Sequence, residues 1–164
     1  MPQVNEVQMM DYFLKRIVAD NEHALHGKNL KLVARINDDL WTGDFVKLDG
    51  FDIARTYIDE VGDVTETPLA VSISPTISKV RNVYFNFVKK GFSNPFKKLS
   101  DTPVLLQSLI EIVSEANIKT DKYELEPVLY NAYSLKSKVS LPFLALKHSN
   151  IEVVSIIDLD EYGK

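Results

Sequence analysis

Lysine and asparagine residues recur at helical spacing between positions 79 and 98, and these residue types can contact phosphates and base edges. Residues 67–100 contain six basic residues and no acidic residue. Aromatic residues lie between the basic ones, and aromatic rings can stack on unpaired bases. The segment therefore gives one hypothesis, a nucleic-acid-binding surface. Its residues are Lys79, Asn82, Asn86, Lys89, Lys90, Lys97 and Lys98.

The same basic segment also has a purely structural interpretation. Tyr84 and Phe87 fall on the apolar stripe of the expected helix and are core candidates, whereas Phe92 and Phe96 are expected to anchor the following loop. The lysines then form a solvated face or neutralise acidic residues elsewhere in the chain. The formal net charge of −4 and the pI of about 5.4 disfavour nucleic acid as the leading partner.

Residues 38–66 are acidic, with nine acidic and two basic residues. Such a surface can bind a basic protein by electrostatic complementarity, and a partly exposed tryptophan is a common interface anchor, although burial in the core is the more frequent fate of tryptophan. The expected partner-binding surface comprises Asp38, Asp39, Trp41, Asp44, Asp49 and Asp52. A third hypothesis is a metal-dependent hydrolase or nuclease on these aspartates, but their spacing matches no EF-hand loop.

Asp20, His23 and His26 recur every three residues, and three such groups can ligate zinc. The pattern differs from the H-E-x-x-H motif, and the end of a helix favours positive charge without any metal. The sequence contains no G-x-S-x-G, G-x-G-x-x-G or P-loop motif. We therefore assign no catalytic residue, no metal ligand and no cofactor, and an enzyme is the less favoured class.

The composition is that of an ordinary soluble domain. The chain has 164 residues, 45% of them hydrophobic and 26% charged, which fits one domain spanning residues 1–164. The absence of cysteine excludes disulfides, thiolate metal sites and cysteine nucleophiles. No leader-like segment and no long apolar run are present, so the expectation is a cytoplasmic protein with no membrane association.

Hydrophobic periodicity predicts the elements that must position these residues. Helices are expected at 5–26, 51–61, 75–90, 103–116 and 124–136, with 51–61 almost equally compatible with a strand. Strands are expected at 29–37, 40–48 and 69–73. A terminal hairpin is expected to pair 142–147 with 151–159, and the apolar run in 151–159 favours a central strand.

This order of elements predicts an α+β fold, with an antiparallel-rich sheet packed by several helices and ending in a β-hairpin. The leading functional hypothesis is a non-enzymatic binding protein of the inhibitor, immunity-type or adaptor kind. It would recognise a protein partner through its acidic and basic surfaces, and opposite charges on two faces also permit self-association. Nucleic-acid binding through 79–98 is the alternative hypothesis.

Overall fold

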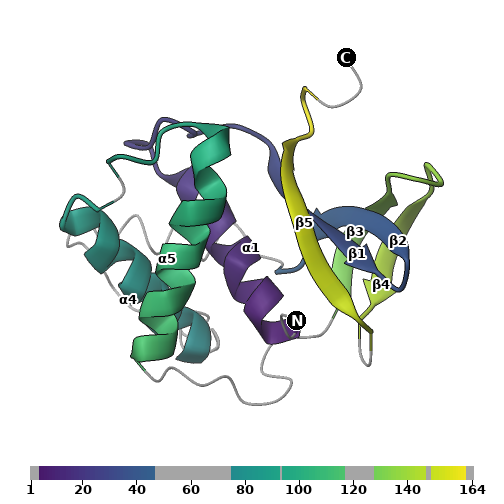
Figure 1. Cartoon of the computed structure of the whole chain (residues 1–164), viewed down its shortest axis with the longest axis horizontal. Coiled ribbons are helices and arrows are strands. Elements are labelled where there is room, and N and C mark those ends of the chain that lie inside the picture. Colours follow the sequence, from purple (N-terminus) through teal and green to yellow (C-terminus); the bar gives the residue numbers. More distant parts are fainter. Residues whose placement is uncertain (1–3, 47–74, 93, 117–127, 147–148, 162–164) are drawn as a thin grey trace, which may run out of the picture.

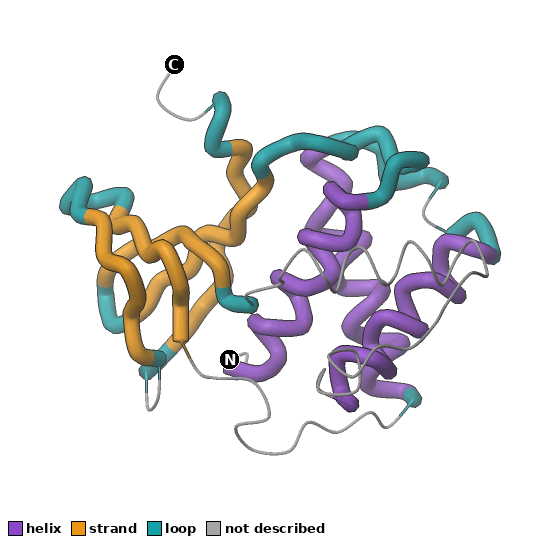
Figure 2. Tube along the Cα trace, turned by 180° about the vertical axis from the view of Figure 1, so that it is seen from behind, coloured by secondary structure: helices purple, strands orange, loops and turns teal. Residues whose placement is uncertain are grey.

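The computed structural model describes residues 4–46, 75–92, 94–116, 128–146 and 149–161. In these ranges the helices are α1 (Val4–Ala19), α4 (Pro75–Lys89) and α5 (Thr102–Glu115), with a short 3-10 helix, η1 (Leu99–Asp101). The strands are β1 (Leu30–Ile36), β2 (Asp39–Asp44), β3 (Val128–Ser134), β4 (Ser140–Ala145) and β5 (Ile151–Asp158). The helices gather on one side of the molecule and the sheet forms the other (Figures 1 and 2).

The five strands form one antiparallel sheet in the order β4-β3-β2-β1-β5, which confirms the α+β fold with an antiparallel sheet. The turn between β1 and β2 consists of Asn37 and Asp38, both with positive φ, which suits a tight hairpin of right-handed twist. The two outer strands are β4 and β5. None of the helices in the described ranges is long and apolar enough to cross a membrane.

Helix α1 joins the two layers, because it contacts both β1 and α5. Its buried face includes Tyr12, Phe13 and Ile17, which belong to one hydrophobic core shared by the helices and the sheet. Arg16 on the same helix lies over the rings of two α4 residues, with its guanidinium carbon 5.8 Å from the centre of Tyr84 and 5.1 Å from that of Phe85.

Helices 75–90 and 103–116 are confirmed as α4 and α5, but the predicted helix 5–26 extends too far. Helix α1 stops at Ala19, and residues beyond it form turns. The Asp20 carboxylate accepts a hydrogen bond from the Glu22 N–H, and His23 Nδ1 accepts one from the Leu25 N–H. These local side-chain acceptors take backbone donors that a continuing helix would use.

The predicted helix 124–136 is wrong over 128–134, where the chain forms strand β3. Leu129 and Ala132 are both buried although they are three residues apart, a spacing that resembles a helix. The register against β2 shifts in this region, and Asn131 has a positive φ of 50°. An irregularity of this kind inserts a residue and breaks the two-residue period of a strand.

A C-terminal hairpin is present, but β4 pairs with β3, and β5 pairs with β1. The predicted pairing of 142–147 with 151–159 and the central position of 151–159 are therefore wrong. Strand β5 pairs instead with β1, which is distant in sequence. No other described strand pairs with β5, so it lies at the edge of the sheet. The predicted elements 51–61 and 69–73 lie outside the described residues.

Candidate functional site

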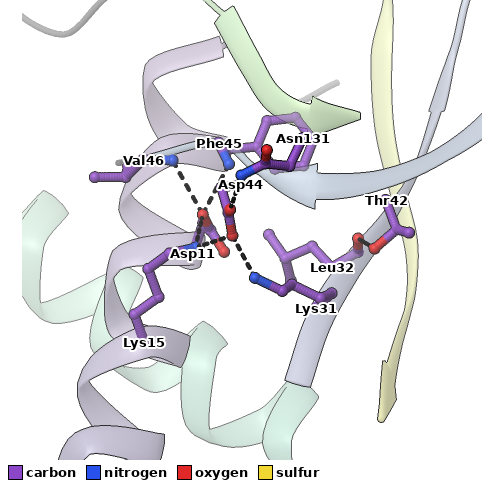
Figure 3. A network of polar contacts seen from close by, with 9 residues as sticks. All are labelled: Asp11, Lys15, Lys31, Leu32, Thr42, Asp44, Phe45, Val46 and Asn131. Atoms are coloured by element: carbon purple, nitrogen blue, oxygen red, sulfur yellow. Dashed lines mark hydrogen bonds and ion pairs between the residues drawn. The ribbon is translucent and has the colours of Figure 1, made fainter. Parts of the chain in front are cut away.

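A cluster of charged side chains lies between α1 and the end of β2 (Figure 3). The side chain of Asp11 on α1 is fully buried, and its Oδ2 accepts three hydrogen bonds. The donors are Lys15 Nζ at 2.6 Å, Phe45 N at 2.9 Å and Val46 N at 3.0 Å. Asp11 therefore holds the backbone segment that follows β2 against the middle of α1.

Asp44 completes this cluster from the sheet side. Its carboxylate forms ion pairs with Lys15, at 3.1 Å, and with Lys31 of β1, and it accepts a hydrogen bond from Asn131 Nδ2 of β3 at 3.1 Å. Burial alone would raise the pKa of Asp44, but the two lysines and Asn131 outweigh it and lower the pKa to about 2. Burial would likewise lower the pKa of Lys15, but the charges of Asp11 and Asp44 raise it above 10.5.

We expect the Asp44 contacts to make the free energy of unfolding pH-dependent. The folded pKa lies below the ordinary value of 3.8, so the stabilisation is complete above that pH and disappears as the pH falls through about 2. With allowance for partial solvent screening, the loss amounts to about 1–2 kcal/mol. Urea titrations between about pH 6 and pH 2 measure it. Asp44→Asn should flatten this part of the curve, and an unchanged profile in that variant would contradict the assignment.

Both carboxylates are engaged by lysines, amides or the Asn131 side chain, while the buried Oδ1 of Asp11 accepts no hydrogen bond from the described residues. The chemistry of the cluster is that of an internal tie between helix and sheet. Asp44, which was expected on the acidic surface, thus belongs to this internal contact between helix and sheet. Gly43, directly before it, packs so closely on β3 that a Cβ there would lie 2.6 Å from the carbonyl oxygen of Tyr130.

The remaining residues of the expected acidic surface differ in their surroundings. Asp38 is exposed in the β1–β2 turn. The Asp39 carboxylate accepts hydrogen bonds from the N–H of the adjacent Leu40 and from the Ser134 hydroxyl of β3. Trp41 is half-buried and packs against the core. Asp49 and Asp52 lie outside the described residues.

In the Asp20–His23–His26 group, the side chains of Asp20 and His23 make contacts within the fold, and His26 is exposed. The Asp20 carboxylate accepts hydrogen bonds from the Glu22 N–H and from the Tyr84 hydroxyl of α4. Burial lowers the pKa of His23, against the opposing charge of Asp20 and a hydrogen bond with the backbone of Phe96. In the described ranges no group of three or more histidine, aspartate or glutamate side chains is placed to hold a metal ion.

The polar residues of the basic segment are exposed along α4 and the loop that follows it. The exposed set is Lys79, Asn82, Asn86, Lys89, Lys90, Lys97 and Lys98. Within the part of the chain that the structure describes, none of these lysines forms an ion pair. Tyr84 and Phe87 are buried, as predicted from the apolar stripe, whereas 53% of the Phe92 side chain is exposed.

Lys97 and Lys98 line a groove of about 550 Å³ together with Lys28, which lies 69 positions before Lys97 in the sequence. We call this the lysine groove. Its apolar wall comes from Leu25, Leu99 and the end of β5, and Asp158 and Glu161 stand on its β5 side. The Asp158 carboxylate accepts a hydrogen bond from the Asp160 N–H and so holds the turn after β5.

The contribution of Lys28 was not predicted from the sequence. It is a single lysine in a turn, between Gly27 and Asn29, and no local pattern distinguishes it. It reaches the groove because the turns after α1 pack against the loop before η1, where His23 meets the backbone of Phe96. Lys89, Lys90 and the polar residues of α4 do not line this groove.

Comparison of the chain with protein-family models, with curated protein sequences and with solved structures gives no match.

Proposed function

We propose that this chain is a non-enzymatic binding protein that recognises an acidic segment of a protein partner at the lysine groove. The observation that carries the proposal is the convergence of Lys28, Lys97 and Lys98, from two distant segments, on one groove with an apolar wall. None of the three forms an ion pair with another described residue. Their charges are therefore available to carboxylates of a partner.

The apolar wall of the groove favours a protein segment over nucleic acid. Protein interfaces combine an apolar centre with a polar rim, and Leu25, Leu99 and Ile157 supply the former here. Single-stranded nucleic acid needs several exposed aromatic rings. Of the aromatic residues of the basic segment, Tyr84 and Phe87 are buried and Phe92 is the one large exposed ring among those described.

The proposal predicts that the chain binds poly-L-glutamate and that Lys97→Gln combined with Lys98→Gln weakens this binding about tenfold at low salt, equivalent to about 1.4 kcal/mol. The matched control removes the same charge elsewhere, with Lys136→Gln and Lys138→Gln in the β3–β4 turn. Fluorescence anisotropy of labelled poly-L-glutamate measures all three proteins. Equal loss in the two double variants would show that only net charge matters, which contradicts a specific groove.

A further inference from the structure

Strand β5 borders the lysine groove and also a second groove of about 380 Å³. The second groove lies between β5 and residues of the two helices α1 and α5, including Met10 and Leu106. Ile156 lines both grooves. Between them the two grooves are lined by every residue of β5 from Val153 to Asp158. In Figure 1 this strand is the part of the sheet that lies beside the helices.

The backbone of Ile156 faces away from β1. The Leu159 N–H donates to the Asn29 carbonyl oxygen at 2.9 Å, and Lys31 pairs with Ile157. Hydrogen-bonded and non-hydrogen-bonded pairs alternate along antiparallel strands, so the N–H groups of Ile156 and Asp158 and the Ile156 carbonyl point outward. No described residue pairs with these three groups on that side. They form a hydrogen-bonding edge at the point where the grooves meet.

The opposite edge of the sheet, strand β4, contains a residue that hinders pairing with a further strand, and β5 contains no such residue. Strand β4 carries Pro142, which has no N–H to donate and discourages pairing with a further strand. Strand β5 contains no proline and no lysine, and 40% of its Val154 side chain is exposed. The pairing of β5 with β1 is irregular at Val154 but regular from Ser155 to Asp158, and a regular, unpaired edge of this kind accepts an added strand.

We propose that β5 takes up an extended peptide segment of a partner protein as a sixth strand, an inference that rests on the proposed function of the lysine groove. The segment carries acidic residues at one end, which meet Lys28, Lys97 and Lys98. It carries apolar residues at the other end, which enter the groove formed by Met10, Leu106 and Val153. Backbone hydrogen bonds to Ile156 connect the two ends.

Amide hydrogen exchange of the full chain tests this directly. The probes are two synthetic peptides, three glutamates followed by Thr-Val-Thr-Val and the same residues in reverse order, because either strand direction is compatible with the edge. At about 1 mM peptide, one of them should slow exchange of the Ile156 and Asp158 N–H groups about tenfold or more. The Ile157 N–H, already facing β1, is the internal control and should not change.

Three results would overturn the inference. Lysine-dependent binding of poly-L-glutamate without protection at Ile156 by either peptide would leave the proposed function standing and exclude strand addition. Equal protection by peptides with glutamine in place of glutamate would exclude the charge-matched partner. Protection at Ile156 that is already present without peptide, and that grows with protein concentration, would show that a second copy of this chain occupies the edge.

A pair of variants at one position separates the backbone from the side chain. Ile156→Pro removes the outward N–H, whereas Ile156→Ala shortens the side chain and keeps that donor. The proline variant should lose peptide binding at least about tenfold more than the alanine variant. Equal losses would contradict backbone pairing. The exchange experiment on the unmodified chain decides the question if the proline variant does not fold.

Discussion

Replacement of Asp11 by alanine should lower the free energy of unfolding by about 3–5 kcal/mol, the largest effect that we expect from a single polar substitution here. The variant leaves the Phe45 and Val46 N–H groups without their acceptor inside the protein. It also leaves the Lys15 ammonium with one carboxylate partner in place of two. Unpaired buried donors and charges lose their hydration without compensation.

Urea denaturation followed by circular dichroism measures this effect, with Asp38→Ala as the matched control. Asp38 is an exposed aspartate in the β1–β2 turn and should change the free energy of unfolding by less than about 0.5 kcal/mol. Asp11→Asn preserves the shape and one acceptor oxygen but removes the charge, and should fall between the two. A loss below about 1 kcal/mol in Asp11→Ala would show that the tie between α1 and β2 contributes little to stability.

Gly43→Ala should lower the free energy of unfolding by about 2–4 kcal/mol, because the added methyl group has no room. A Cβ at position 43 would lie 2.6 Å from the carbonyl oxygen of Tyr130 and 2.9 Å from that of Asn131. Both atoms belong to the backbone of β3, which cannot move without disturbing its pairing with β2. The clash also lies directly beside Asp44 and its ion pairs.

Gly27→Ala provides the control for this experiment. Gly27 has a φ of +78°, but a Cβ there would meet no atom within 4 Å. The left-handed conformation alone costs about 1–2 kcal/mol for a residue with a side chain. Gly43 also has a positive φ, of +156°, so both variants carry conformational strain and only the Gly43 variant adds the steric clash. Thermal or urea unfolding compares the two, and a Gly43 variant no less stable than the Gly27 variant would contradict the close approach of β2 and β3.

The helices α4 and α5, in the middle of the sequence, are predictable from local sequence. The Pro75 start, the apolar stripe with Tyr84 and the lysines before Gly91 together define α4. Strand β3 was mistaken for a helix because its irregularity near Asn131 places buried residues three apart. The partner of β5 could not be read from the sequence, because β1 lies more than a hundred residues away and local hairpin signals favoured β4.

The site is predictable only in part, because its residues come from segments that are distant in sequence. Lys97 and Lys98 belong to a basic segment that composition reveals. Lys28 joins them only through the packing of the turns after α1. The inward position of Asp44 likewise depends on Lys15 and Lys31, which come from a helix and a strand earlier in the chain. Neither arrangement can be predicted from neighbouring residues in the sequence.

The most direct test of an acidic protein partner at the lysine groove compares two anionic probes with the unmodified chain. Binding of labelled poly-L-glutamate and of labelled single-stranded and duplex DNA is measured at about 50 and 200 mM salt. We predict binding of poly-L-glutamate that weakens with salt, and affinity for either DNA at least about tenfold lower at the same salt concentration. Tighter binding of DNA, with a steep dependence on salt, would contradict the proposed function and identify nucleic acid as the partner.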